Sequence, residues 1–136
     1  MSMPMWGAPP AAAGADAYFA PITTAKQLKR VLSRGEPAFV LVHASWCGHC
    51  QSFIEEVAHS SPRGRIPRCH AIESDHLEGM DLSTIMASPA DKPDAPSVPV
   101  QVEGFPSALY VSSDGVVLFG TGGGNVRSLF GMMKSG

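Results

Sequence analysis

Residues 39–53 read Phe-Val-Leu-Val-His-Ala-Ser-Trp-Cys-Gly-His-Cys-Gln-Ser-Phe, an apolar run followed by two cysteines at Cys-x-x-Cys spacing. Continuous apolar character over 38–42 is typical of a central strand that is covered on both faces. After the cysteines, Phe53, Ile54 and Val57 recur at the three-to-four-residue spacing of a buried helix face. The stretch therefore predicts a strand, a turn that carries two thiols, and an amphipathic helix.

The two cysteines are expected to have different roles. If the helix begins near Cys47, this residue is exposed in the first turn, where free N–H groups and the helix dipole favour a thiolate. Cys50 lies about one turn later and belongs to the buried stripe of the helix. A disulfide between neighbours on one turn opens and closes with little backbone movement. Cys47 is therefore predicted to be the nucleophile, and Cys50 the protected thiol that acts second.

The stretch resembles the active site of thioredoxin-like proteins, in which a strand leads to Trp46, Cys-Gly-His-Cys and an amphipathic helix. The motif alone is weakly specific, because zinc sites use the same cysteine spacing. The pair Gly48 and His49 resembles that of the protein disulfide isomerases. A second match lies at 102–107, Val-Glu-Gly-Phe-Pro-Ser, which resembles the family's loop with a cis-proline. The likeness covers roughly residues 18–134.

The resemblance implies a fold, a reaction and a substrate site. The fold is the α/β thioredoxin fold, with a central mixed sheet of roughly four to five strands flanked by helices. The reaction is thiol–disulfide exchange of the protein disulfide isomerase type through a redox disulfide of Cys47 and Cys50, and no cofactor is expected. In the family the cis-proline loop faces the dithiol and presents backbone to an extended substrate. The residues expected to bind that substrate are Trp46, Gly48, Phe105 and Pro106.

The resemblance also names the kind of partner. Cysteine-containing client proteins are expected, or a redox partner such as glutathione or a reductase. The formal net charge is −2 and the chain has no long run of Lys or Arg, so neither a nucleic acid nor a membrane surface is expected as a partner. Two other functions stay open: a cytosolic, thioredoxin-like reductant, and a redox-silent interaction module that binds through its Pro-rich segment.

Two histidines are candidates for acid–base roles. His49 can carry positive charge near Cys47, which favours the thiolate and the more oxidising disulfide of an oxidase or isomerase; otherwise it is a solvated turn residue. The family usually carries a buried acid six residues before its first cysteine, where this chain has Leu41. His43 lies on the same face of the strand and is the candidate proton acceptor for Cys50. The alternative is a histidine that only packs.

Zinc is a further alternative for the thiols. Cys69 and His70, combined with the two cysteines of the motif, supply the usual ligand types. Adjacent residues on a strand point to opposite faces, so Cys69 and His70 are not expected to bind one ion. No metal site is predicted, and Cys69 is expected to be a buried free thiol.

Length and composition agree with one small domain. The 136 residues, of which 44% are hydrophobic and 16% charged, are enough for a core of their own, and a monomer is expected. Residues 1–17 are expected to be a flexible tail and residues 18–136 the thioredoxin-like domain. The tail has no basic start and no continuous apolar core, and residues 133–136 are not a retention signal, so a cytoplasmic location is expected by default.

The remaining elements are expected in the family's order. The segment 88–99 contains four prolines and is expected to be an irregular surface loop, which either borders the substrate groove or only connects. The local signals predict a strand at 18–20, a capping box at Thr24 and Gln27, a strand at 69–73, a short helix capped by Asp81 that carries Leu82, Ile85 and Met86, a hairpin around Asp114 and Gly115, and a last helix over 126–133 capped by Asn125.

Overall fold

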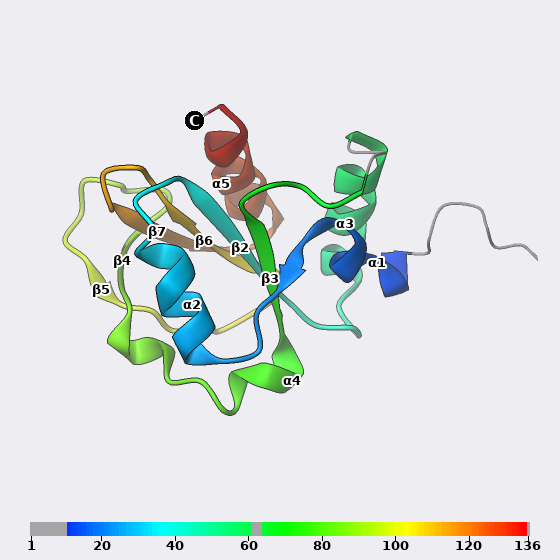
Figure 1. Ribbon diagram of the computed structural model, residues 1–136, viewed down its shortest axis with the longest axis horizontal. Coiled ribbons are helices and arrows are strands. Elements are labelled where there is room, and N and C mark those ends of the chain that lie inside the picture. Colours follow the sequence, from blue (N-terminus) through cyan, green and yellow to red (C-terminus); the bar gives the residue numbers. More distant parts are fainter. Residues whose placement is uncertain (1–10, 61–63, 136) are drawn as a thin grey trace, which may run out of the picture.

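The computed structural model describes residues 11–60 and 64–135, and side chains from residue 15 onward. Seven strands form one mixed sheet in the order β1-β3-β2-β6-β7-β4-β5 (Figure 1). In chain order the elements are α1 (Ala11–Tyr18), β1 (Ala20–Pro21), α2 (Ala25–Leu32), β2 (Ala38–His43), α3 (Gly48–Ser60), β3 (Cys69–Glu73), α4 (Ser74–Leu77), the 3₁₀ turn η2 (Leu82–Thr84), β4 (Met86–Pro89), β5 (Val98–Pro99), β6 (Ser107–Val111), β7 (Val117–Thr121) and α5 (Gly123–Ser135).

Strand β2 lies at the centre of the sheet, as its apolar run predicts. It pairs in parallel with β3 and antiparallel with β6. Its side chains alternate between the two faces, so that Phe39 and Leu41 face one core, and Val40 and Val42 the other. All of these side chains are fully buried, which explains why the run is continuously apolar rather than alternating.

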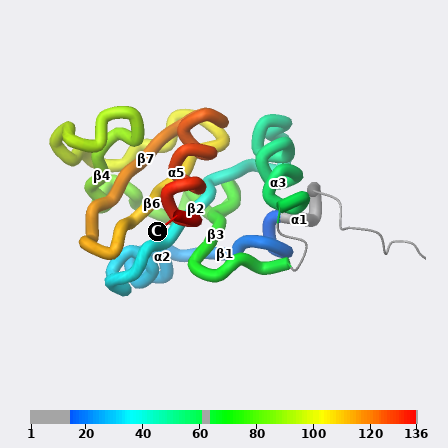
Figure 2. The backbone as a smooth tube through the Cα atoms, turned by 90° about the horizontal axis from the view of Figure 1, so that it is seen from above, coloured from blue at the N-terminus to red at the C-terminus, as the bar shows by residue number. Residues whose placement is uncertain are grey.

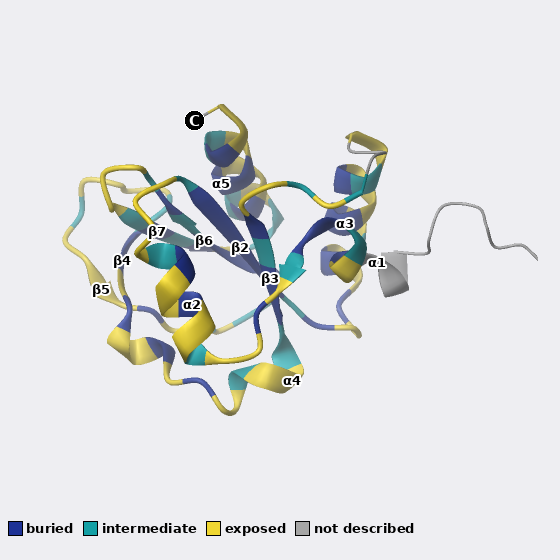
Figure 3. Ribbon diagram, viewed as in Figure 1, coloured by how far each residue is buried: buried dark blue, intermediate teal, exposed yellow. Residues whose placement is uncertain are grey.

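Helices cover both faces of the sheet. On one face, α1, α3 and α5 enclose a core in which four aromatic rings pack together, those of Phe19, Phe39, Phe53 and Phe130. On the other face, α2 and η2 bury Leu28, Val31 and Leu82. The outer surfaces of these helices are exposed (Figure 3). The sheet is therefore a layer between two apolar cores, as the predicted α/β fold requires.

The N-terminal prediction is wrong for residues 11–17. These residues belong to helix α1, which lies beside α3 in both views (Figure 2). Alanine favours the helix, and the side chains of Ala15 and Tyr18 are buried in the aromatic core. Tyr18 thus ends a helix, and the short strand expected at 18–20 is Ala20–Pro21. The rest of the expected tail lies outside the described residues.

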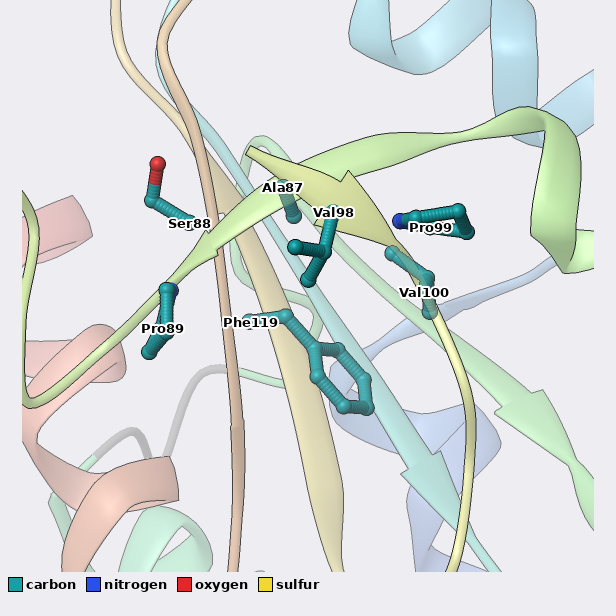
Figure 4. Close-up of a pocket in the computed structure, with 7 residues that line it drawn as sticks. All are labelled: Ala87, Ser88, Pro89, Val98, Pro99, Val100 and Phe119. Carbon is teal, nitrogen blue, oxygen red and sulfur yellow. The ribbon is translucent and has the colours of Figure 1, made fainter. Parts of the chain in front are cut away.

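The segment 88–99 is not simply an irregular loop. Its ends belong to β4 and β5, which pair with each other and extend the sheet beyond β7, so the sheet has more strands than expected. Its prolines are compatible with this, because Pro99 lies on the edge strand, where no partner needs its missing N–H. The Ser88 hydroxyl donates to the carbonyl of Ala95 at 2.8 Å and closes the connection. A small, mostly apolar cavity of about 110 Å³ is lined by residues of these two strands, by Val100 and by Phe119 of β7 (Figure 4).

Local signals elsewhere succeed with two corrections. The Thr24–Gln27 capping box is present, and the hairpin turns at Gly115 with φ of 87°. Asp81 caps only a 3₁₀ turn, and Met86 already belongs to β4. Asn125 lies within α5 rather than at its cap, and its amide donates to the carbonyl of Thr121 at 3.0 Å. Within 11–60 and 64–135, no helix has the length and apolar character needed to cross a bilayer.

Candidate dithiol site

The turn between β2 and α3 holds the two thiols. β2 ends at His43, and the N–H of Cys47 donates to the carbonyl of Ala44 at 3.1 Å, which closes the turn. The carbonyl of Cys47 accepts from the N–H of Gln51 at 3.1 Å, so Cys47 occupies the cap position of α3 and Gly48 begins the helix. The strand and the helix therefore fix the backbone on both sides of the thiols.

The two thiols are free and lie against each other. The main-chain N–H of Cys50 donates to Sγ of Cys47 at 3.1 Å. Burial raises the pKa of Cys50 to about 12, and a hydrogen bond between the two side chains acts in the same direction. A main-chain hydrogen bond from Ala44 opposes this shift. Cys50 therefore keeps its proton, as expected of the protected thiol.

Cys47 is less exposed than the sequence suggests. Its exposed fraction is only 7%, whereas that of the neighbouring Trp46 is 74%. Phe105 packs against the cluster of Ala44, Cys47 and Cys50, and its ring meets the Trp46 indole edge to face at 5.5 Å between centroids. The exposed group at this turn is therefore the indole, and the expectation of an exposed Cys47 is wrong.

The loop at 102–107 lies beside the dithiol, as the resemblance implies. The peptide bond between Phe105 and Pro106 is cis. The Ser107 hydroxyl donates to the carbonyl of Gly104 at 2.7 Å, and the N–H of Gly122 donates to the carbonyl of Pro106 at 2.8 Å. These bonds hold the loop on both sides of Phe105. Among the described residues, no main-chain hydrogen bond involves Phe105 itself.

Solved structures of other proteins share this fold. No protein-family model and no curated protein matches the chain. Among solved structures, the chain is similar to chloroplastic thioredoxin z, with a TM-score of 0.51, 20% identity and coverage of 88% of this chain and 96% of that one. It has a thioredoxin-like fold. The thioredoxin from Trypanosoma brucei brucei gives a TM-score of 0.51 at 17% identity over 97% and 99% of the two chains. Mitochondrial thioredoxin 3 from Saccharomyces cerevisiae gives a TM-score of 0.50 at 16% identity, with coverage of 86% of this chain and 94% of that one. Identities this low show the fold alone.

Within the thioredoxin-like fold, the other motif residues are exposed. Gly48 and His49 lie on the outer side of the first turn of α3. A Cβ atom at Gly48 meets no other atom within 4 Å, so packing does not require glycine there. The structure therefore brings Phe105 to the dithiol, with the Trp46 ring against it and Pro106 next to it across the cis bond, and it leaves Gly48 and His49 on the solvent side of the turn.

His43 lies next to the dithiol turn, at a separate cavity. A cavity of about 200 Å³ is bounded by His43, Asp16, Glu73 and His76. Burial lowers the pKa of His43, and the carboxylates of Glu73 and Asp16 act in the opposite direction. Leu41, at the position of the family's acid, is fully buried. Asp16 was not predicted as a site residue, because it belongs to the segment expected to be a tail. Glu73 was not predicted either, although its place at the end of the expected strand 69–73 is a usable signal.

Cys69 packs in a different cluster of buried residues from the two thiols of the motif. It is buried in the aromatic core, whereas Cys47 and Cys50 form a separate cluster with Ala44. Burial raises the pKa of Cys69 to about 12, which keeps the thiol protonated. Among the described residues, no three side chains of His, Cys, Asp or Glu are grouped so that they could hold a metal ion.

Proposed function

We propose that the chain is a thiol–disulfide oxidoreductase that exchanges disulfides with protein cysteines through Cys47 and Cys50. One observation carries this proposal: two free thiols in contact at the cap of α3, with an N–H donor on the sulfur of Cys47. The two thiols also differ, because Cys50 is fully buried with a raised pKa, whereas Cys47 keeps some exposure and its sulfur accepts an N–H hydrogen bond, so Cys47 is assigned the first attack.

The reaction proceeds in two balanced steps. The thiolate of Cys47 attacks one sulfur of a client disulfide, so that the client S–S bond breaks, a mixed disulfide forms and one client thiolate leaves. Cys50 then loses its proton and attacks the sulfur of Cys47, which releases the second client thiolate. The client gains two electrons, and the chain is left with a Cys47–Cys50 disulfide. The reverse sequence oxidises a client dithiol.

The client is proposed to lie extended over Trp46, Phe105 and Pro106. The exposed indole supplies a large apolar contact surface, and the ring of Phe105 supports it from the side. The main-chain groups of Phe105 are available for hydrogen bonds with an extended peptide. Gly48 leaves the surface beside Cys47 open, because it carries no side chain.

The preferred direction is that of an oxidase or isomerase. His49 lies on the first turn of α3, close to Cys47 in sequence, as in the motif that resembles the protein disulfide isomerases. A cytosolic thioredoxin-like reductant is the second candidate, because the similar solved structures are thioredoxins by name. The structure gives a redox-silent interaction module no comparable support, because the paired thiols serve no packing purpose that other small residues could not serve. Equilibration of the dithiol with glutathione distinguishes the two redox directions.

Client trapping tests the proposed function. We expect Cys50→Ser to accumulate mixed disulfides through Cys47, because the resolving thiol is absent. Cys47→Ser should trap no clients, and Cys69→Ala should behave as the wild type. Non-reducing gels after acid quenching show the trapped species. Equal trapping by Cys50→Ser and Cys47→Ser would contradict the roles assigned here, and trapping by neither variant would contradict the function itself.

A further inference from the structure

The cavity beside His43 lies at the same edge of the sheet as the dithiol. β1, β3 and β2 are parallel, so their carboxyl ends meet at one edge, from which the chain continues into the dithiol turn. His43, the last residue of β2, is in register with Glu73, the last residue of β3. Asp16 reaches the cavity from α1 and His76 from α4, which follows β3 directly (Figure 1). Four titratable side chains from four elements thus surround one space.

Main-chain contacts connect this cavity to Cys50. Ala44 directly follows His43, and it lies in the same cluster as the two thiols. The carbonyl of Ala44 accepts from the N–H of Cys47, and Ala44 packs in the same buried cluster as Cys50. The thiol of Cys50 therefore lies against the residue that is bonded to His43. The cavity and the dithiol are adjacent sites, separated by one short segment of the chain.

The groups that face His43 are mostly acidic. Asp16 and Glu73 are carboxylic acids and His76 is the remaining titratable group, and among the residues that the structure describes no Lys or Arg lines the cavity. The guanidinium of Arg65 donates to the main-chain carbonyl of Asp16 at 2.7 Å. Among the described residues, no carboxylate lies within 4.0 Å of a His43 nitrogen. The carboxylates therefore act on the imidazole across the cavity rather than through a direct ion pair.

We propose that Glu73 and Asp16 are positioning residues that keep His43 basic enough to take the proton of Cys50, and that their shared cavity conducts this proton to solvent. The inference deepens the proposed function and rests on it. During resolution, the Cys50 S–H bond breaks, its proton moves to the His43 imidazole, and the sulfur attacks Sγ of Cys47. The mixed disulfide bond breaks in this step, and the client sulfur leaves as a thiolate. The imidazolium is stabilised by the two carboxylates until the proton passes to solvent at the cavity mouth.

The charge balance explains why both carboxylates are needed. Burial disfavours the imidazolium and so weakens His43 as a base, whereas each negative charge nearby strengthens it. Removal of Glu73 should therefore lower the pKa of His43 further. The resolution rate falls when His43 is protonated, so the acid limb of its pH profile should move to lower pH, while the plateau at higher pH should fall because the base is weaker.

The test measures His43 and the dithiol separately. The pKa of His43 is followed by NMR in the full chain, and resolution of the mixed disulfide with a chromogenic aryl disulfide is followed by rapid mixing across pH. For Glu73→Gln we expect the midpoint of the His43 titration and the midpoint of the acid limb of the resolution rate both to move to lower pH by about half a pH unit or more. The resolution rate at the high-pH plateau should fall roughly threefold to tenfold. Asp16→Asn should do the same to a smaller extent. Asp114→Asn, in the β6–β7 turn, is the matched control and should change neither quantity.

Each result has a distinct meaning. An unchanged His43 midpoint in Glu73→Gln would show that the carboxylate does not act on the imidazole, and the inference would be wrong. A shifted midpoint with an unmoved resolution profile would also overturn it, because His43 would then not serve Cys50. In both cases the first attack by Cys47 still proceeds, so the proposed function stands. Failure of Cys50→Ser to form any mixed disulfide with the aryl disulfide would instead contradict the proposed function.

Discussion

Cys50 sets the chemical requirement of this site. Its pKa is raised to about 12 because the side chain is buried, so the thiol does not ionise unaided near neutral pH. Resolution of a mixed disulfide needs the thiolate, and therefore a group that accepts the proton. The fully buried Leu41 cannot do this. His43 is the nearest candidate along β2, because the next residue, Ala44, contacts the thiol.

A single substitution tests this role of His43. We expect His43→Phe to slow the resolution step by roughly tenfold or more, since general base catalysis is typically of that size or greater. The first attack by Cys47 should be nearly unchanged. Leu41→Glu in the same background should restore part of the rate, at a cost in stability from burial of a carboxyl group. Rapid mixing with a chromogenic disulfide separates the two steps.

A matched control removes a different imidazole. His59→Phe changes an exposed histidine in the last turn of α3, far along the helix from the thiols, and should leave both steps unchanged. If resolution proceeds at the wild-type rate in His43→Phe, the histidine only packs, and solvent or the client supplies the base.

At the scale of single elements, helix α2 is determined by local sequence. The Thr24 hydroxyl accepts from the N–H of Gln27 at 3.2 Å, and the Gln27 side chain accepts from the N–H of Thr24 at 3.2 Å. Helix α2 is short and mostly exposed, and its stability depends on this cap and on the buried side chains of Leu28 and Val31. The cap contributes to stability but lies outside the dithiol cluster.

Loss of the α2 cap should affect stability without affecting the reaction. We expect Thr24→Ala to lower the free energy of unfolding by about 1 kcal/mol, because the N–H of Gln27 then loses its hydrogen-bond acceptor at the start of α2. Urea unfolding measures this change, and the rate of disulfide exchange should stay at the wild-type value. Lys26→Ala, on the exposed side of the same helix, is the control and should be close to neutral. A neutral effect of Thr24→Ala would show that the cap is not formed in solution.

The elements that could be predicted from sequence are those with local signals. The capping box, the Gly115 turn and the apolar run of β2 each depend on neighbouring residues, and all are present. α1 and the β4–β5 pair depend on distant partners. Tyr18 is helical because it packs into the aromatic core, and Val98 is extended because it pairs with Ala87. This strand pairing was not predicted, because a segment rich in proline has the composition of an irregular loop.

The candidate site divides in the same way. The cysteine motif identified both thiols, because residues close in sequence determine the turn, and a second motif at 102–107 identified the loop beside them. The low exposure of Cys47 depends on Phe105, and the environment of His43 depends on Asp16 and Glu73, which come from α1 and β3. These residues are far apart in the sequence and come together only in the folded chain. A single sequence gives no direct measure of such contacts.

At the scale of the whole molecule, the redox state of the dithiol is linked to stability. In the folded chain the N–H of Cys50 donates to Sγ of Cys47 at 3.1 Å, and the Cys47 side chain helps Cys50 to keep its thiol proton. Both effects favour the reduced form, and the second is lost when the disulfide forms, because the thiol proton is gone. If the reduced form is more stable than the oxidised form in the folded chain, the redox equilibrium of Cys47 and Cys50 shifts toward the dithiol. The disulfide is then a stronger oxidant than in the unfolded chain.

The proposed oxidase-like direction therefore predicts that the reduced chain is more stable than the oxidised chain. Urea unfolding of both forms measures the difference, and about 1.4 kcal/mol corresponds to 30 mV in the potential of the dithiol against its unfolded state. The double variant Cys47→Ala/Cys50→Ala is the control, and its unfolding should not respond to oxidant. A more stable oxidised form would contradict the proposed direction and favour a thioredoxin-like reductant, because folding would then stabilise the disulfide and drive electrons toward the client.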